Sequence, residues 1–359
     1  MQAKDDQLRG CCANCFGDPG LTNNIIPKVI DDNGCLSDDG ECGYCGTRGT
    51  VLIDPNWLSI WFEMLLDCYS QADDGEYLEA LLRRDWQLFD HPRMDSPRAK
   101  ELLADILDDG EIVRRRFVRG EMMRSEGAVD WESLRSEIMH RNRWFLDGEV
   151  DLDSFGRHVA QTVDTLTLSA TERPRWFRAR IMSGDRPFDS MEMGAPPMEM
   201  ATPGRANPAG IRYLYLASKR ETAIAEIRPH PGHSVCVAEF EVTSRRNANL
   251  VNPRKNASPF ILEGAEGIAG LWKGLPLLER LGEELSKPVR PQTAPFAYAL
   301  SQYMCEYIKK CGFDGIVYQS SIADGVNMAL FNTELATPGA TSVVHVDRVL
   351  IDFSQSLQR

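Results

Sequence analysis

The sequence contains no run of 18 apolar residues, which is about what a helix needs to cross a bilayer. Its first ten residues, MQAKDDQLRG, lack the positively charged stretch followed by an apolar stretch that is typical of an export signal. Internal repeats and low-complexity segments are also missing. These absences predict a globular protein that stays in the cytoplasm and has no membrane partner.

An excess of positive charge is absent as well, because 53 Asp and Glu outnumber 40 Lys and Arg and the net charge is -13. Most of the negative charge lies in residues 1–172, whereas residues 173–359 carry slightly more Lys and Arg than Asp and Glu. A long polyanion usually binds a strongly basic surface, so nucleic acid is not an expected partner. A modest anionic ligand suits the second half better, although charge also drifts along a sequence without any function.

Cysteines are concentrated at one end of the chain. Six of the ten lie in the first 45 residues, at positions 11, 12, 15, 35, 42 and 45. C-x-x-C spacing, which lets a turn present two thiolates to one ion, occurs twice, and four thiolates complete the tetrahedral site that structural Zn²⁺ prefers. The predicted ligands are Cys12, Cys15, Cys42 and Cys45. Cys11 and Cys35 are alternative ligands, and the competing interpretation is a set of free or redox-active cysteines.

Residues 56–170 have apolar side chains at helical spacing. One helix is predicted to begin after Asn56 as its cap, and a second to contain Tyr77 and Leu78. A third should begin at Ser96, with Pro97 at the first helical position. Two further helices are predicted over 131–145 and 154–168. The expected result is an acidic helical domain.

One pair of residues in this region suggests a nuclease. Arg135 and His140 have the R-x4-H spacing that resembles the catalytic motif of HEPN ribonucleases. The spacing also arises by chance, and a histidine on a structural helix is the alternative.

From residue 170 onward the sequence changes to short strands, turns and prolines. Strands are predicted over 176–181, 213–217, 234–242, 313–319, 327–331 and 343–353. The four residues from Ser218 to Glu221 fit a capping box, which would begin a helix that carries Glu226 and ends before Pro229. Residues 253–295 are expected to be loop with one helix over 275–285. Another helix is predicted over 296–311, with Gly312 as its stop.

Five polar residues of this half could form one site: Arg178, Arg205, Tyr215, Glu226 and Ser320. An arginine fork binds phosphate, a tyrosine ring stacks on another ring, and a carboxylate stabilises positive charge. Dinucleotide chemistry would use all three. Their spacing in the sequence does not by itself show that they meet.

Four segments carry a resemblance to a known family. FRARI (177–181), GRANPAGIRYLYLA (204–217), ETAIAEIRP (221–229) and FDGIVYQSS (313–321) together resemble the RES domain, named for its Arg, Glu and Ser. The amino-terminal cysteine pairs and helices are similar to the zinc-bearing, HEPN-like segment that precedes RES in longer members. The resemblance implies an α+β protein with three parts, a zinc-binding module (1–55), a helical HEPN-like domain (56–170) and a mixed α/β, ADP-ribosyltransferase-like RES domain (171–359).

Characterised members of this family are toxins that consume NAD⁺ by phosphorolysis or hydrolysis, or that transfer ADP-ribose. The resemblance therefore implies NAD⁺ as substrate, phosphate as a candidate co-substrate, and an antitoxin or regulatory protein as a partner. By motif, the catalytic residues are Arg178, Glu226 and Ser320, and the binding residues are Arg205, Tyr215, Ser321 and Asn327. Ser321 is the close rival of Ser320 as the motif serine, and Asn327 aligns with a motif asparagine of unknown role.

The implied reaction is cleavage of the bond between nicotinamide and ribose, with Glu226 stabilising the ribose cation and the two arginines holding phosphate. One alternative is transfer of ADP-ribose to a macromolecule. Another is a zinc-containing module that binds nucleic acid or protein and carries an inert RES domain. The sequence leaves open the acceptor, the oligomeric state, including a homo-oligomer, and the role of residues 1–170.

Overall fold

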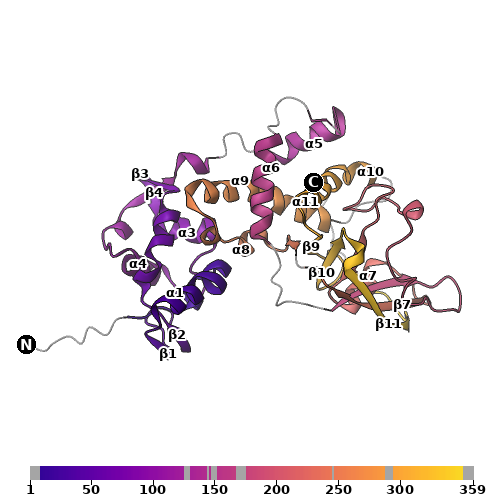
Figure 1. The fold of residues 1–359 in the computed structure, drawn as a ribbon, viewed down its shortest axis with the longest axis horizontal. Helices are drawn as coiled ribbons and strands as arrows, with labels where there is room; N and C mark the ends of the chain where they lie inside the picture. The colour runs from indigo at the N-terminus through magenta and orange to yellow at the C-terminus, as the bar shows by residue number, and fades with distance from the viewer. Residues whose placement is uncertain are drawn as a thin grey trace, which may run out of the picture. The chain divides into compact units, whose positions relative to one another are not determined.

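The computed structural model describes residues 9–124, 130–143, 145–146, 152–166, 175–244, 246–287 and 294–350 (Figure 1). The chain forms two compact units that are interleaved along the sequence. The N-terminal unit contains Met1–Asp130, Val150–Leu166 and Asn252–Leu278, and the C-terminal unit contains Trp131–Glu149, Thr167–Val251 and Glu279–Arg359. The division into 1–55, 56–170 and 171–359 stays a prediction. In the described ranges, no helix is both long and apolar enough to span a bilayer.

The N-terminal unit begins with the cysteine-rich segment. A 3-10 turn, Ala13–Cys15, presents the first cysteine pair. A π-helical turn runs into helix α1, Ile26–Asn33, which ends at Gly34 with a φ of 81°. Strands β1 (Ser37–Glu41) and β2 (Arg48–Leu52) pair antiparallel and flank the second cysteine pair. This segment is therefore a knuckle followed by a short hairpin.

The rest of the N-terminal unit is mainly helical, and the aromatic rings of Phe16, Phe62 and Phe260 connect its parts. The Phe16 and Phe62 ring centroids are 5.9 Å apart, and those of Phe62 and Phe260 are 5.0 Å apart. Its described helices are α2 (Ser59–Leu66), α3 (Leu78–Trp86), α4 (Ser96–Leu107), α6 (Leu152–Thr165), α8 (Pro253–Asn256) and the first part of α9 (Gly264–Ser286). Residues far apart in the sequence thus share one core.

Two helix starts differ from the prediction. Helix α2 follows a 3-10 turn in which Asp54, not Asn56, accepts the capping bond, from the Asn56 backbone N–H. Helix α4 is capped by Asp95, which accepts from the Arg98 backbone N–H, while the Ser96 hydroxyl donates to Glu79. In both cases an aspartate close by supplies the carboxylate acceptor that helix starts favour.

A two-stranded sheet interrupts the expected helical domain. Strand β3 (Tyr69–Tyr77) pairs antiparallel with β4 (Arg116–Arg119). Arg119 donates from Nε and Nη2 to the two carboxylate oxygens of buried Asp85, at 2.9 and 2.5 Å, and the Tyr69 hydroxyl donates to the same carboxylate. Arg119 also stacks on the ring of Trp272, 4.5 Å from its centroid. This fork holds β4 against α3 and α9.

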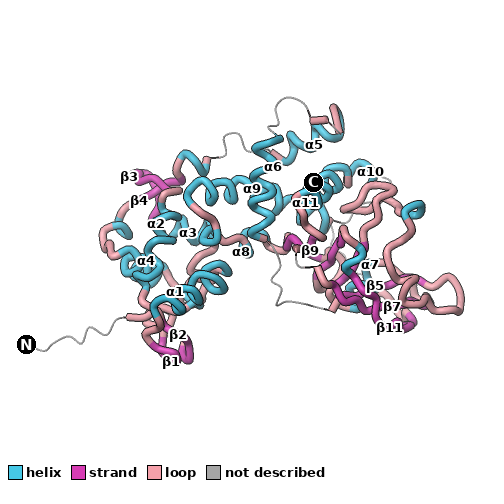
Figure 2. Tube along the Cα trace, in the orientation of Figure 1, coloured by secondary structure: helices cyan, strands magenta, loops and turns pink. Residues whose placement is uncertain are grey.

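The C-terminal unit is built on a seven-stranded sheet with the order β11-β7-β5-β6-β10-β9-β8. Figure 2 shows its strands in magenta. All neighbouring strands are antiparallel except β8 and β9. The strands are β5 (Trp176–Ile181), β6 (Leu214–Ala217), β7 (Ser234–Val242), β8 (Asn247–Asn249), β9 (Gly315–Gln319), β10 (Val326–Leu330) and β11 (Ala336–His345). The prediction missed β8 and placed the last strand too late, over residues of which 351–353 lie outside the described part.

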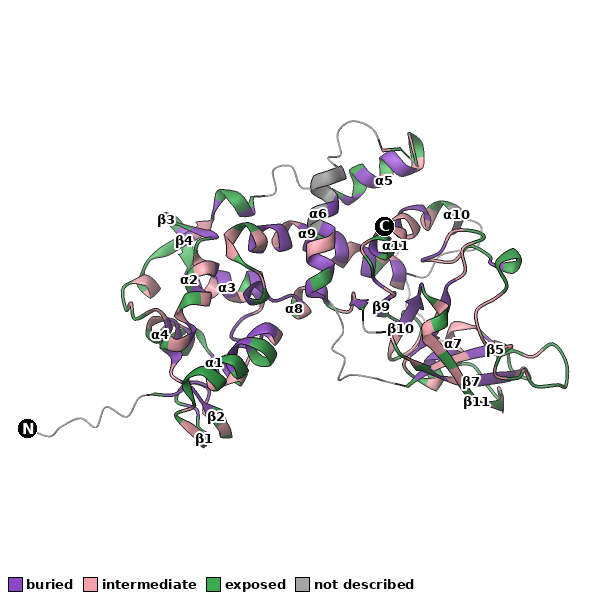
Figure 3. Ribbon diagram, viewed as in Figure 1, coloured by how far each residue is buried: buried purple, intermediate pink, exposed green. Residues whose placement is uncertain are grey.

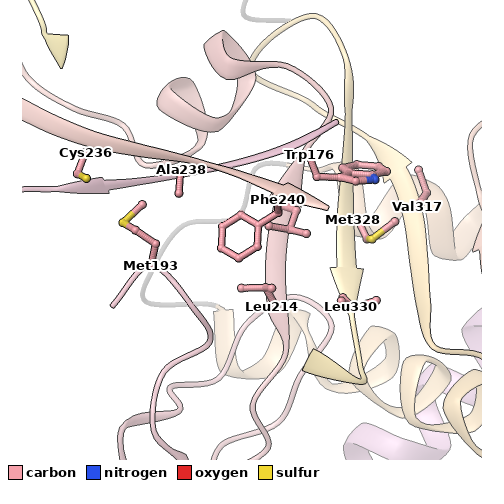
Figure 4. Packing of buried hydrophobic residues seen from close by; sticks show 10 residues of the cluster. Trp176, Met193, Leu214, Cys236, Ala238, Phe240, Val317, Met328 and Leu330 are labelled. Carbon is pink, nitrogen blue, oxygen red and sulfur yellow. The ribbon is translucent and has the colours of Figure 1, made fainter. Parts of the chain in front are cut away.

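The two faces of this sheet pack against different parts of the chain. One face carries a hydrophobic core of Trp176, Phe240, Leu214, Met328 and their neighbours, shown in Figure 4. The opposite face is covered by helix α7 (Arg220–Glu226) through small side chains. Strands β9 and β10 are buried over almost their full length, as the colours of Figure 3 show. The core face holds the sheet together, and the α7 face carries Tyr215 and Asn327 beside Glu226 of α7.

The helices of the C-terminal unit are α5 (Trp131–His140), α7, α10 (Ala294–Ala297), α11 (Ala299–Lys310) and the end of α9. The predicted capping box at Ser218 is wrong, because Lys219 occupies the cap position without a side-chain bond. The Ser218 hydroxyl instead accepts a hydrogen bond from the Val326 N–H, at 2.9 Å. Helix α9 begins eleven residues before the predicted helix over 275–285 and contains Pro276.

Candidate active site

A cavity of about 380 Å³ lies where the central sheet opens. Strands β5 and β6 share a single residue pair, Phe177 with Ala217, whereas the other edge of β5 pairs over its whole length with β7 and the other edge of β6 pairs with β10. The cavity is lined by residues of β5, β6 and α7, by the segment 203–205, and by side chains from β9, β10 and the start of α11. A gap between strands in an otherwise continuous sheet gives ligands access to polar groups of several elements.

Glu226 is the acidic residue of this cavity. It is the last residue of α7, whose Ala223 packs against Ala179 and Ala217 of the sheet. These small side chains let the helix approach closely. Glu226 Oε1 accepts hydrogen bonds from Ser320 Oγ at 2.8 Å and from Asn327 Nδ2 at 2.5 Å. Within the described ranges, no hydrogen bond reaches Oε2, so this oxygen is available to a ligand.

The two donors to Glu226 are themselves fixed. Ser320 follows β9; its N–H donates to the Gly325 carbonyl, and its Oγ accepts from the N–H groups of Ile322 and Ala323, both at 3.3 Å. Asn327 lies on β10 on the face toward α7. Ser321, the rival of Ser320, is exposed. The structure thus places Ser320, and not Ser321, on the carboxylate.

Arg178 brings a positive charge to the cavity. In the part of the chain that the structure describes, its Nη1 is buried and has no hydrogen-bond partner. Burial, together with the positive charge of Arg180, lowers the pKa of Arg178 to about 10, so the group stays protonated at neutral pH. Arg180 itself donates to the Glu192 carbonyl and stacks on Phe188. Arg178 is therefore a cation with unused donors, which suits a bound anion.

Arg205 lies on a tight turn at the edge of the cavity. The Gly204 N–H donates to the Asn207 carbonyl at 2.9 Å, which closes the turn. The Arg205 guanidinium donates from Nη1 to the Leu285 carbonyl at 2.5 Å. Leu285 belongs to the last turn of α9, where backbone carbonyls lack partners within the helix and carry partial negative charge. This end of α9 therefore anchors the arginine and leaves its other N–H groups for a ligand.

Tyr215 contributes its ring to the cavity, while its hydroxyl belongs to the same turn. The hydroxyl accepts from the Ala206 N–H at 3.1 Å and donates to Asn207 Oδ1 at 2.8 Å. Burial raises the pKa of Tyr215. A Cβ added to Gly204 would lie 2.5 Å from both the Tyr215 hydroxyl and Asn207 Oδ1, so only glycine fits there. The tyrosine offers a ligand its ring and not its hydroxyl.

Sequence reasoning missed three aromatic residues of the cavity wall, Phe177, Tyr298 and Tyr318. Phe177 and Tyr318 lie inside the motif segments, and Tyr318 pairs with Asn327 on the same side of the sheet, so strand alternation could have found it. Tyr298 sits between α10 and α11, in a stretch that was predicted as one continuous helix, and no sequence signal marked it.

The four predicted zinc ligands meet in the N-terminal unit. The sulfur atoms of Cys12, Cys15, Cys42 and Cys45 all lie within 4.8 Å of one another, and all four residues are buried. The Cys12–Cys45 and Cys15–Cys42 sulfur pairs are 3.5 and 3.4 Å apart. A tetrahedral Zn²⁺ with Zn–S bonds of about 2.3 Å separates its sulfurs by roughly 3.8 Å. The donor set therefore fits a metal ion with closed coordination.

The two alternative ligands lie outside this group. Cys11 forms a β-bridge with Ile53 through its backbone. Cys35 is partly exposed, and its thiol donates to Asp38 at 3.0 Å.

The R-x4-H residues of α5 are placed differently. Arg135 pairs with Glu132 one turn earlier, at 3.7 Å, and contacts the Met139 sulfur. His140 is exposed at the end of the helix. Both side chains are those of an ordinary surface helix, and the HEPN-like interpretation of this region stays a prediction.

Comparison with known proteins matches the chain to a family model and to solved structures. Residues 175–352 match the model of the RES domain. The search of curated proteins gave no match. The crystal structure of the M. tuberculosis MbcT-MbcA toxin-antitoxin complex aligns over 53% of this chain and 94% of that chain, with 11% identity and a TM-score of 0.32. The range matched by the family model includes every residue of the cavity in the C-terminal unit.

Proposed function

We propose that the protein is an enzyme that consumes NAD⁺ by cleaving the bond between nicotinamide and ribose, because residues 175–352 match the model of the RES domain. The observation that carries the proposal is the Glu226 carboxylate, which Ser320 and Asn327 hold in the wall of a cavity that also contains the unpaired Arg178. An oriented carboxylate and a free cation suit a substrate that develops positive charge at one end and carries phosphates at the other.

The reaction breaks the bond between ribose C1″ and the nicotinamide nitrogen, and the bonding electrons leave with neutral nicotinamide. The ribose carbon then carries oxocarbenium character, which the negative charge of Glu226 stabilises. Glu226 Oε2 would bind ribose hydroxyls or lie beside the cation. Attack by water yields ADP-ribose and a proton, and attack by phosphate yields ADP-ribose 1″-phosphate.

The two arginines would bind the pyrophosphate or an incoming phosphate. A guanidinium binds phosphate oxygens with two parallel hydrogen bonds, and such bonds are strong in a partly buried site. Arg178 gains most, because its buried Nη1 has no partner in the described residues. The rings of Tyr215 and Tyr298 would pack against the substrate's aromatic groups.

The full chain, incubated with NAD⁺ in the presence and absence of phosphate, should release nicotinamide. Mass spectrometry separates ADP-ribose from ADP-ribose 1″-phosphate and so identifies the acceptor. Glu226→Gln should retain only a small residual activity, whereas Glu221→Gln, at an exposed carboxylate in the first turn of the same helix, should match wild type. A wild-type protein that releases no nicotinamide under either condition contradicts the proposal. Labelling of proteins in a lysate by ADP-ribose would instead identify a transferase.

Two further parts of the proposal concern the whole chain. The four clustered cysteines would hold a structural Zn²⁺ that stabilises the N-terminal unit. Unrestrained NAD⁺ consumption would make the protein toxic, and an antitoxin or regulatory partner would limit it. Induced expression should therefore stop growth and lower cellular NAD⁺ with wild type but not with Glu226→Gln. Equal growth arrest by wild type and by Glu226→Gln would show that toxicity does not depend on this site.

A further inference from the structure

Two consecutive residues of α11 hold the backbone of the Arg205 turn. The Ser301 hydroxyl donates to the Arg205 carbonyl at 2.7 Å. Gln302 Nε2 donates to the carbonyls of Gly204 and Asn207, at 2.8 and 3.0 Å. Helix α11 therefore binds three of the four carbonyls of the turn, although it lies almost a hundred residues away in the sequence. Nothing in the cavity itself requires these contacts.

The turn is also tied from within. Asn207 Nδ2 donates to the carbonyls of Thr202, Pro208 and Ile211, at distances between 2.8 and 3.1 Å. Its Oδ1 accepts from the Tyr215 hydroxyl. A side-chain amide with such a set of partners fixes the path of the backbone on both sides of the turn. The backbone of Arg205 thus has little freedom to move.

Arg205 is consequently held at both ends, its backbone by Ser301 and its guanidinium by the Leu285 carbonyl. A long arginine side chain normally loses rotamer entropy when it binds a ligand, and fixing it beforehand removes part of that loss. Such preorganisation is useful where a charged group must meet a substrate phosphate in one orientation.

On the basis of the proposed function, we propose that Ser301 and Gln302 are positioning residues, which act through Arg205 to set the affinity of the cavity for the pyrophosphate part of the substrate. Neither touches the reacting bond. Their contribution is a rigid turn from which the arginine reaches the phosphates, so they should influence substrates with phosphates and not those without.

Enzyme kinetics would separate this role from a general effect on folding. Gln302→Met keeps the length of the side chain but removes both donors, and Ser301→Ala removes the third. Each should raise the KM for NAD⁺ about tenfold with little change in kcat, because binding that is equal in ground state and transition state appears in KM. With nicotinamide riboside, which lacks phosphates, kcat/KM should stay within about twofold of wild type. Ser301→Thr, which keeps the hydroxyl, should restore the KM for NAD⁺.

A matched control lies on the same helix. Lys310 is exposed at the end of α11 and is remote from the contacts described above, so Lys310→Ala should leave both substrates unaffected. Thermal unfolding of each variant checks that the C-terminal unit remains folded. Equal losses with NAD⁺ and with nicotinamide riboside would indicate structural damage and overturn the inference.

Binding without catalysis gives an independent test, with ADP-ribose as the probe in titration calorimetry. Gln302→Met should weaken ADP-ribose binding about tenfold in the wild-type background and cause no further loss in an Arg205→Lys background, because both changes act on one interaction. This pattern in a protein that releases no nicotinamide would support the inference and reject the proposed reaction. Active enzyme whose variants bind NAD⁺ and ADP-ribose as wild type does would reject the inference alone. A wild-type chain that binds no ADP-ribose would overturn it.

Discussion

Removing either hydrogen bond to Glu226 should slow the proposed reaction by a predictable amount. Asn327 Nδ2 and Ser320 Oγ donate to the same carboxylate oxygen, at 2.5 and 2.8 Å. A hydrogen bond to a charged group is worth about 1.5–3 kcal/mol. If that energy serves to orient the carboxylate in the transition state, Asn327→Ala and Ser320→Ala should each lower kcat by roughly 10- to 150-fold.

The assay is release of nicotinamide from saturating NAD⁺, followed for single and double variants. Both donors act on one oxygen, so their losses should not add, and in a Glu226→Gln background neither substitution should cause a further loss. Ser321→Ala is the matched comparison, because Ser321 is adjacent in the sequence but exposed. Ser321→Ala should lower kcat less than Ser320→Ala does.

Three results would refute this reasoning. Full activity in Asn327→Ala would show that orientation of the carboxylate is unimportant. A larger loss from Ser321→Ala than from Ser320→Ala would mean that the wrong serine has been assigned. Additive losses in the Glu226→Gln background would show that the two donors act on something other than this carboxylate.

Further predictions concern stability and metal content. Burial raises the pKa of Asp18 to about 6, so the native state binds a proton more tightly than the unfolded chain does. Relative to Asp18→Asn, the unfolding free energy of wild type should therefore rise by up to about 3 kcal/mol as the pH falls from 7 to 4. Denaturant unfolding that gives the same difference between the two proteins at every pH would contradict this. Asp85→Ala should destabilise the N-terminal unit by about 3 kcal/mol in the same assay, because it leaves the Arg119 fork without its buried partner; a loss below 1 kcal/mol would argue against that role. Cys42→Ser should reduce the zinc measured in purified protein from about one ion per chain to a small fraction, whereas unchanged zinc would exclude the four-cysteine site. Gly204→Ala should weaken ADP-ribose binding, since its Cβ would press on the turn that carries Arg205; unchanged affinity in calorimetry would show that the turn adapts.

Local sequence signals located most of the sheet. Strands β5 and β7 have the predicted bounds, and β6, β9 and β10 differ by one or two residues at an end. These segments alternate or are continuously apolar, so their burial follows from the sequence itself. Helix α9 starts earlier than the predicted helix over 275–285, and it continues through Pro276 although proline commonly kinks or ends a helix. The β3/β4 pair was missed because it joins segments about forty residues apart, 69–77 and 116–119, which no local pattern connects.

The metal site was also largely predictable from local sequence. The C-x-x-C spacing alone places two thiolates on one turn, and the sequence therefore predicted which four cysteines bring their sulfurs together. The sequence did not decide whether Cys11 or Cys35 also binds the metal, because that depends on the direction of each side chain in the folded segment. Neither residue belongs to the group of four cysteines whose sulfurs lie within 4.8 Å of one another, and the Cys35 thiol donates to Asp38 instead.

For the candidate active site, the motifs by themselves determined which polar residues to examine, because each motif is a local run of residue types. Only the tertiary structure decided which of them meet. In the folded domain, Glu226 at the end of α7 accepts hydrogen bonds from Ser320 and Asn327, whereas Ser321 is exposed. The Tyr215 hydroxyl is hydrogen-bonded within the Gly204–Asn207 turn. Ser301 and Gln302 carried no signal in the sequence, since their contacts exist only once α11 packs against that turn. Hydrogen bonds between distant segments depend on the packing of the whole domain, and no local pattern encodes them.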